Sequence, residues 1–243
     1  MSKVLLEMSV SLDGYVTDPD VSPEEPMGRG GERLHEWMFE GRSPAESEQY
    51  EIDHFRDIGA VIVGRRMADL GIGYWGDEPT FHAPVFVVTN RPAETIVKAG
   101  GTSYRFVTNG IDDALRQARE AAGQADVIVM GGGDIARQYL RAGAVDELRL
   151  HLVPVILGAG TRLFDDEPSP SVALRPVEVT GTPRATHLTY EVEHSAAQRC
   201  LTPARASARP RRRRARAGRA GRPPTPRAVR GTRARSAIRH SPS

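Results

Sequence analysis

The sequence predicts an α/β sandwich built on a mostly parallel sheet, with antiparallel strands at its C-terminal end. Two observations lead to this prediction. Between residues 60 and 143, short apolar runs alternate with segments of helical character, as in parallel β–α–β units. After residue 147, three strand-like segments follow one another with no helix between them, which is typical of antiparallel strands. Residues 1–194 show no internal repeat and no second core, so we expect one domain there.

The first quarter of the chain predicts a strand, a long loop and a helix. Residues 3–11 alternate between apolar and other side chains, as expected for a strand with one apolar face. Residues 12–45 are rich in Gly, Pro and acidic residues, and they predict a loop with about one helical turn near residues 34–39. Residues 46–57 predict a helix that ends before Gly59.

Four short apolar runs in the middle of the chain predict strands buried on both faces. Three helices are predicted among them: a short one after Gly64, one with an acidic start that ends at Gly123, and one that follows three glycines. Alternation predicts three further strands near the C-terminal end of the body. The predicted buried strands are residues 60–63, 85–88, 104–107 and 126–130, the last two helices 112–122 and 135–143, and the last strands 147–153, 172–181 and 186–193.

The composition excludes several classes of protein. Hydrophobic residues make up 39% of the chain and charged residues 26%, which are ordinary values for a globular protein. No apolar run approaches the roughly 18–20 residues of a membrane helix, and the N-terminus lacks the features of a secretory signal. A single cysteine, Cys200, excludes a disulfide framework and a multi-cysteine metal site. We therefore expect a cytoplasmic protein without a metal.

The charge is divided unevenly along the chain. Residues 195–243 hold 15 Arg and no Asp, Glu or Lys, which leaves residues 1–194 with a net charge of −13. We expect this tail to be disordered, because its Arg, Ala, Pro, Gly, Ser and Thr cannot bury enough apolar surface to order it. Three explanations stay open: the tail binds nucleic acid or another polyanion, it makes a loose contact with the acidic body, or it results from translation past the natural end of the protein.

Three predicted strands end in residues that suit a phosphate group. Gly131–Gly133 open a helix, so bare backbone and free amides could approach an anion. Gly64-Arg65 adds a guanidinium to the same arrangement, and Thr89-Asn90-Arg91 combines groups that suit an adenosine ribose or its 2′-phosphate. Each motif alone is also compatible with a turn or a solvated arginine that binds nothing. Because ligands bind beyond the carboxyl ends of parallel strands, the three together indicate a dinucleotide.

The order of these motifs resembles the dihydrofolate reductase-like superfamily. The segments that carry the resemblance cover about residues 2–193, and they read SVSLDGYV, VIVGRRM, VFVVTN, VIVMGGGDIARQYL and DELRLHLVPVILGAGTRLF. They are most similar to the reductase (C-terminal) domain of the bifunctional riboflavin-biosynthesis deaminase–reductase and its stand-alone relatives. The resemblance implies a three-layer sandwich, a homodimer and an NADPH-dependent reductase. The zinc signature of the deaminase half is absent from the sequence.

The resemblance also implies which residues form the site. Asp13 is the candidate catalytic residue, which would orient the substrate or relay a proton. The substrate would be bordered by Met8, Ser11, Gly14, Leu157 and Gly158. The cofactor, NADPH, would be bound by Gly64, Arg65, Met67, Thr89, Asn90, Arg91, Gly131, Gly132, Gly133, Asp134, Ile135 and Ala136.

These residues favour an NADPH-dependent reductase of a small planar heterocycle, resembling 5-amino-6-(5-phosphoribosylamino)uracil reductase of riboflavin biosynthesis. The acidic loop that follows Tyr15 would repel a ribose phosphate, however. The alternatives are a dihydrofolate reductase-type activity, a relative that binds the nucleotide without turnover, a deazaflavin in place of a nicotinamide, and polyanion binding by the tail.

Other aromatic and titratable residues are expected to play smaller parts. Trp37, Tyr15, Tyr74 and Trp75 could line a pocket for a planar substrate, although packing is the commoner role of such residues. The seven histidines show no metal-ligand spacing, so we expect all of them to be structural or on the surface.

Overall fold

The computed structural model describes residues 2–39, 41–165 and 171–194. The tail that we predict to be disordered, residues 195–243, lies outside the described residues. Within the described part of the chain, no helix is long and apolar enough to cross a membrane.

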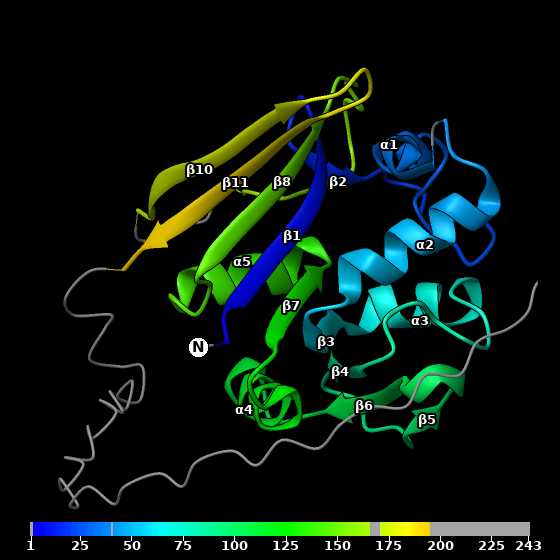
Figure 1. The fold of residues 1–243 in the computed structure, drawn as a ribbon, viewed down its shortest axis with the longest axis vertical. Helices are drawn as coiled ribbons and strands as arrows, with labels where there is room; N and C mark the ends of the chain where they lie inside the picture. The colour runs from blue at the N-terminus through cyan, green and yellow to red at the C-terminus, as the bar shows by residue number, and fades with distance from the viewer. Residues whose placement is uncertain (1, 40, 166–170, 195–243) are drawn as a thin grey trace, which may run out of the picture. The chain divides into compact units, whose positions relative to one another are not determined.

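A nine-stranded sheet forms the centre of the domain (Figure 1). Its strand order is β10-β11-β8-β1-β7-β3-β4-β6-β5. The strands from β8 to β6 pair in parallel, whereas β11 pairs antiparallel with β8 and β10, and β5 pairs antiparallel with β6. This arrangement confirms the predicted fold class. The strands are β1 Val4–Ser11, β3 Ile58–Gly64, β4 Pro84–Val88, β5 Ile96–Val97, β6 Ser103–Val107, β7 Asp126–Gly131, β8 Glu147–Val153, β10 Ala173–Gly181 and β11 Thr186–Glu193.

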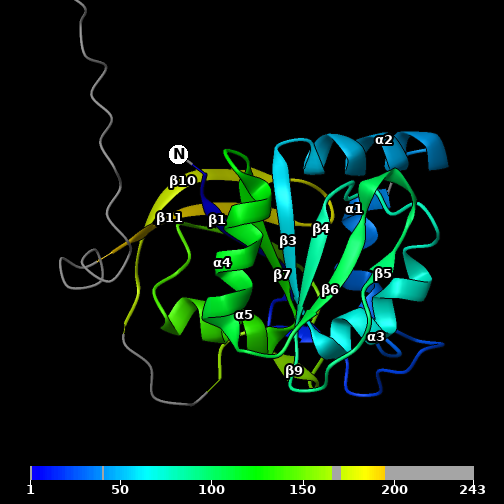
Figure 2. The same ribbon diagram turned by 90° about the horizontal axis from the view of Figure 1, so that it is seen from below.

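Helices cover both faces of the sheet and bury two separate apolar clusters (Figure 2). On one face, α4 (Ile111–Ala122) and α5 (Gly133–Arg141) pack against the even-numbered side chains of β1, such as Leu6. On the other face, α2 (Pro44–Phe55) and α3 (Arg65–Tyr74) contribute Phe55 and Ala68 to a cluster with Leu5. The alternation of side chains along β1 therefore places successive residues in different cores.

The observed elements differ from the predicted ones mainly at their ends. Helix α2 begins two residues earlier than predicted, because Ser43 and Glu46 form a capping box and Pro44 occupies the first helical turn. The predicted turn of helix near residues 34–39 is a 3-10 turn, Gly31–Leu34, followed by α1 (Glu36–Phe39). A second, two-stranded sheet was not predicted; it pairs β2 (Tyr15–Thr17) with β9 (Thr161–Arg162).

Candidate functional site

The chain changes the face of the sheet between two neighbouring strands, β3 and β7. Helix α3 leaves β3 toward one face, whereas α5 leaves β7 toward the other. The two turns lie close together, since a Cβ atom added to Gly64 would lie 3.7 Å from the backbone nitrogen of Gly132 and 2.8 Å from Cγ1 of Ile135. A crevice at such a point is where open α/β sheets bind ligands.

The glycine turn after β7 presents bare backbone to this crevice. Gly131 has a φ of 103°, and its peptide bond to Gly132 is cis. A Cβ atom added to Gly132 would meet nothing within 4 Å, whereas one added to Gly131 would lie 2.8 Å from Sδ of Met8. Gly132 is also the N-cap of α5, and its neighbouring amides carry the partial positive charge of a helix start. The turn therefore suits close contact with an anionic group.

Two arginines at the ends of β3 and β4 are held by one carboxylate. Asp69 accepts from Nε of Arg65 at 2.7 Å and from Nη2 of Arg91 at 3.3 Å. Arg65 also donates to the carbonyl oxygen of Arg91 and lies 5.1 Å from the centre of the Phe106 ring. The hydroxyl of Thr89 accepts from the backbone nitrogen of Arg91 at 3.0 Å. Both guanidinium groups are thereby fixed beside the crevice, where they favour a phosphate.

A cleft with a volume of about 1510 Å³ joins the glycine turn and the arginines. Most of the residues implied for cofactor binding line it, together with Met8 from the substrate group. Gly131 and Ala136 lie behind the lining, and Ala136 is fully buried in the core. The implied residues that line the cleft are Met8, Gly64, Arg65, Met67, Thr89, Asn90, Arg91, Gly132, Gly133, Asp134 and Ile135.

Asp13 and the residues implied for substrate binding, apart from Met8, form a separate hydrogen-bonded cluster. The carboxylate of Asp13 accepts from the Ser11 hydroxyl at 2.6 Å and from the backbone nitrogens of Leu157 and Gly158 at 3.1 and 2.7 Å. The Ser11 hydroxyl, with help from these amides, lowers the pKa of Asp13 to about 2. Ser11, Asp13, Gly14, Leu157 and Gly158 are thus brought together as predicted, but they are absent from the described lining of the cleft. The geometry supports a role in holding the 155–158 loop, and proton relay by Asp13 stays a prediction.

Comparison with known protein families identifies the family to which this fold belongs. The family model for the RibD C-terminal domain matches residues 2–188. The chain belongs to the RibD C-terminal domain family. The uncharacterized proteins YyaP and YwjB of Bacillus subtilis (strain 168) are 22% and 23% identical to it over 174 and 171 residues; each alignment covers 68% of this chain, and 81% and 83% of the two relatives. This membership indicates a reductase-like domain.

Two solved structures share the fold of this RibD C-terminal domain. A protein assigned to riboflavin biosynthesis from Shewanella sp. PV-4 superposes with a TM-score of 0.61 at 20% identity, covering 79% of this chain and 99% of the other. A pyrimidine reductase-like protein from Corynebacterium diphtheriae gives a TM-score of 0.51 at 16% identity, covering 80% and 93%.

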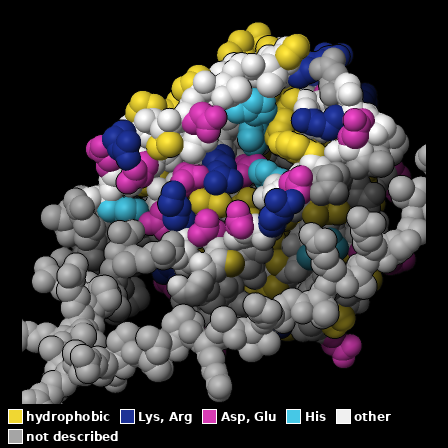
Figure 3. Space-filling model, viewed as in Figure 1, with side chains coloured by type: hydrophobic (Ala, Val, Ile, Leu, Met, Phe, Trp, Pro, Cys, Tyr) yellow, Lys and Arg dark blue, Asp and Glu magenta, His cyan; other side chains and the backbone are white. Residues whose placement is uncertain are grey.

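Histidines, which we expected to be structural or on the surface, gather around a carboxylate at one end of the cleft of this RibD C-terminal domain. Oε1 of Glu7, on β1, lies 2.9 Å from Nε2 of His54 and 3.0 Å from Nε2 of His151. Nδ1 of His151 in turn lies 2.8 Å from Nδ1 of His187. Figure 3 shows histidine side chains among acidic and basic ones on this face. The sequence did not predict this cluster, because Glu7, His54 and His151 come from elements far apart in the chain, β1, α2 and β8.

Glu7 is held ionised in this cluster. Burial alone would raise its pKa, but contacts with His151 and His54 outweigh burial and hold the pKa well below the usual range of a glutamate. The sequence did contain a sign of the cluster: Glu7 interrupts the apolar pattern of a strand that is otherwise largely buried.

Trp37, Tyr74 and Trp75 line the cleft as predicted, but Tyr15 does not. Tyr15 instead lies under the guanidinium of Arg162, 4.6 Å from its ring centre. Thr17 also lines the cleft, but its hydroxyl oxygen is buried and has no hydrogen-bond partner among the described residues. The open Gly132 backbone and the two arginines on Asp69 fit a ligand with several phosphate oxygens.

Proposed function

We propose that this chain is an NADPH-dependent reductase of a small planar heterocycle. The observation that carries the proposal is the junction of the Gly131–Gly133 turn with the two arginines on Asp69, since it combines bare backbone amides and fixed guanidinium groups in one crevice. Membership of the RibD C-terminal domain family supports the same reading. When bound, a reduced nicotinamide would supply hydride, and the chain's own task would be to bind and orient the two reactants.

Each part of the crevice would then hold one part of the cofactor. Gly64, Arg65 and Met67 would lie beside its phosphates and ribose. The glycine turn and the start of α5 would hold the pyrophosphate and the nicotinamide side. Thr89, Asn90 and Arg91 would lie near the adenosine 2′-phosphate, so the charge of Arg91 would favour NADPH over NADH.

Titration of the full chain with NADPH and NADH by calorimetry tests this proposal. We expect NADPH to bind more tightly than NADH. Arg91→Gln should weaken the binding of NADPH by about 10- to 100-fold, because a hydrogen bond to a charged group contributes about 1.5–3 kcal/mol. The same substitution should change the affinity for NADH little. Arg105→Gln, which removes an exposed arginine outside the cleft, is the matched control. Failure of both nucleotides to bind would refute the proposal.

We also propose that the chain works as a homodimer. Strand β10 is exposed along its whole length, and several large apolar side chains on and beside it are left uncovered. Figure 1 shows β10 and β11 extending on the side away from α2 and α3. A second copy of the chain would cover this apolar surface, which consists of Val172, Leu174, Val177 and Val179.

A further inference from the structure

The two ends of the cleft carry opposite charge. Among the described residues that line it, the arginines are Arg65, Arg66 and Arg91, all at the ends of β3 and β4, and no lysine is present. Two aspartates, Asp69 and Asp134, line this end as well, so its three positive charges are only partly offset. Five glutamates line the rest of the cleft, on β1, on α2 and on the segment that leads from β2 into α1. These glutamates are Glu7, Glu24, Glu32, Glu36 and Glu51.

The charge of the acidic end is only partly balanced. Glu36 forms an ion pair with Arg184 at 3.0 Å. Among the described residues, no ion pair is found for Glu24 or Glu32, and both are exposed at the mouth of the cleft. Their field therefore acts on whatever enters from solvent.

The inner end of the cleft adds a buried carboxylate, and one of its oxygens has no hydrogen bond among the described residues. The side chain of Glu7 is only 10% exposed. His54 and His151 contact Oε1, whereas Oε2 has no hydrogen-bond partner within the described chain and forms only a long ion pair with Nη1 of Arg149, at 3.7 Å. A group that enters this end of the cleft meets a fixed negative charge in a setting of low dielectric.

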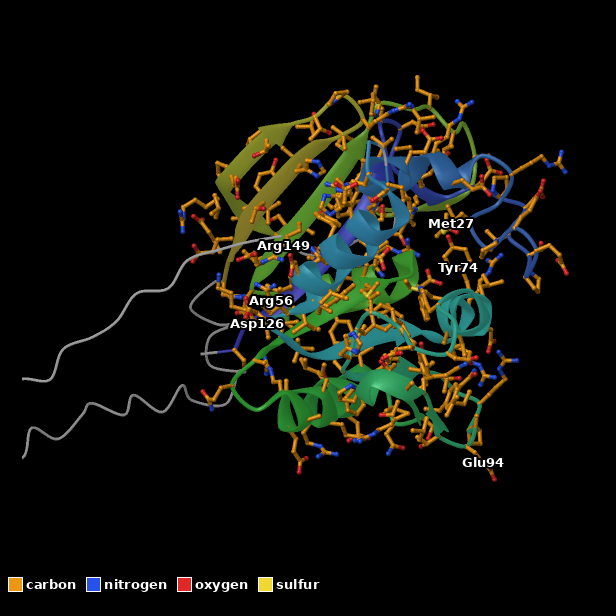
Figure 4. All side chains as sticks on the ribbon, turned by 45° about the vertical axis from the view of Figure 1, so that its right-hand side comes forward. Met27, Arg56, Tyr74, Glu94, Asp126 and Arg149 are labelled. Atoms are coloured by element: carbon orange, nitrogen blue, oxygen red, sulfur yellow. The ribbon has the colours of Figure 1, made fainter. Side chains whose placement is uncertain are left out.

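Aromatic rings at the mouth are exposed without packing against other rings. Tyr74 is 74% exposed and Phe39 is 43% exposed, although both line the cleft. In the described structure no ring–ring contact involves either of them, whereas Trp37 packs deeper, 4.2 Å from the ring centre of His151. Figure 4 shows Tyr74 on the same side of the molecule as Met27, which also lines the cleft. Exposed rings in a cleft suit a flat partner that stacks on them.

We propose that the second reactant is a flat nitrogen heterocycle, neutral or cationic, that carries no phosphate or carboxylate. The identification of this end as the substrate end rests on the proposed function, because that function assigns the arginine end to the cofactor. A phosphate placed here would face several glutamates, and at 4 Å a single pair of like charges costs about 1 kcal/mol in water and about 4 kcal/mol at a protein surface. Ring N–H groups, in contrast, donate to carboxylates, and a protonated ring is attracted by them.

A matched pair of ring compounds tests this substrate class. The probes are 5-amino-6-(ribitylamino)uracil and its 5′-phosphate, which differ only in the phosphate. Each is titrated calorimetrically into the full chain at physiological ionic strength, with and without NADPH. We expect the unphosphorylated probe to bind, and the phosphate to weaken binding at least about tenfold, which corresponds to about 1.4 kcal/mol. The arginine-rich tail can only favour the phosphorylated probe, so it cannot produce this preference.

Charge-reversed variants separate the cleft from the general charge of the chain. In the double variant Glu24→Lys and Glu32→Lys, the phosphorylated probe should bind at least about tenfold more tightly than in the unchanged chain. The matched control is Glu94→Lys with Glu120→Lys, two exposed glutamates that do not line the cleft. Glu94 lies far from Met27 and Tyr74 in Figure 4. The control should leave the ratio of the two affinities unchanged.

The outcomes for the two proposals are distinct. Equal or tighter binding of the phosphorylated probe overturns the substrate class, and so does failure of both probes to bind. Failure of NADPH to bind instead refutes the proposed function, and the titrations without NADPH still report the preference for or against a phosphate.

Discussion

His35 shows how burial of one imidazole couples the stability of the domain to pH. It lies beside the cleft, its Nδ1 is buried, and no hydrogen-bond partner for that nitrogen exists among the described residues. Burial, with a smaller contribution from His151, lowers the pKa of His35 to about 4. The folded state therefore releases this proton more readily than the unfolded state, whose pKa is about 6.5.

From this shift we expect stability to fall as the pH is lowered from about 6.5 to about 4. Above this window His35 is neutral in both states and has no effect on the pH dependence; within it, only the unfolded state takes up the proton. The titration of His35 lowers the free energy of unfolding by at most about 1.4 kcal/mol for each pH unit within this window. Denaturant unfolding of the chain and of His35→Phe across this range measures it, because phenylalanine does not titrate. A difference in unfolding free energy that does not vary with pH would contradict the prediction.

The candidate site was predicted well where it consists of contiguous motifs and poorly where it joins distant strands. Gly131–Gly133, Gly64-Arg65 and Thr89-Arg91 each follow a strand, so topology alone brings them to one edge. Asp13 and the 157–158 amides also come together, but their mutual hydrogen bonds satisfy them. The contact of Glu7 with His151 depends on the register of β1 against β8, which no local pattern in the sequence encodes.

At the scale of elements, the start of β3 is packed unusually closely against the end of α4. A Cβ atom added to Gly59 would lie 2.7 Å from Cα of Ala122 and 2.8 Å from the Cβ atoms of Ala122 and Ala125. Backbone and short side chains cannot move aside as a long side chain would, so an extra methyl group must separate the helix from the sheet.

We therefore expect Gly59→Ala to destabilise the domain by about 1–3 kcal/mol, the usual cost of overpacking. Chemical denaturation measures the change. Gly73→Ala is the matched control: this glycine lies in α3, and a Cβ atom there would meet nothing within 4 Å. The control should be unchanged or more stable by up to about 1 kcal/mol, because alanine is the better helix former. If Gly59→Ala were as stable as Gly73→Ala, the prediction would be wrong, because α4 would then move away from β3 without a loss of stability.

Elements with a periodic pattern or a continuous apolar run were predicted, and strands too short to have either were not. Strand β8 was predicted over its full length because Leu148, Leu150 and Leu152 alternate. Strands β2, β5 and β9 have only two or three residues, so they carry no alternation to detect. Helix α3 is ten residues long, longer than the short helix expected, and its two glycines leave it without a clear apolar stripe in the sequence.

At the scale of the whole molecule, the two edges of the sheet differ in a way that the sequence alone could not show. Alternation of strands and helices predicted a parallel sheet, but the strand order follows from packing. The structure places β5 at one edge, with only two residues, and the nine-residue β10 at the other. A long exposed edge strand with uncovered apolar side chains invites pairing with another chain.

The proposed homodimer predicts that a charge on β10 separates the copies. Val179 is 62% exposed, and it pairs with Leu188 on the same face of the sheet that α5 covers further along. Burial of a glutamate there would cost several kcal/mol without a partner, so Val179→Glu should convert the dimer into a monomer that still binds NADPH. Light scattering coupled to size-exclusion chromatography measures the mass. Val97→Glu, at the β5 edge, places the same charge at a 76% exposed valine and should leave the dimer intact. If the unchanged chain is monomeric, or if Val179→Glu remains a dimer, the apolar surface of β10 is not the interface between two copies.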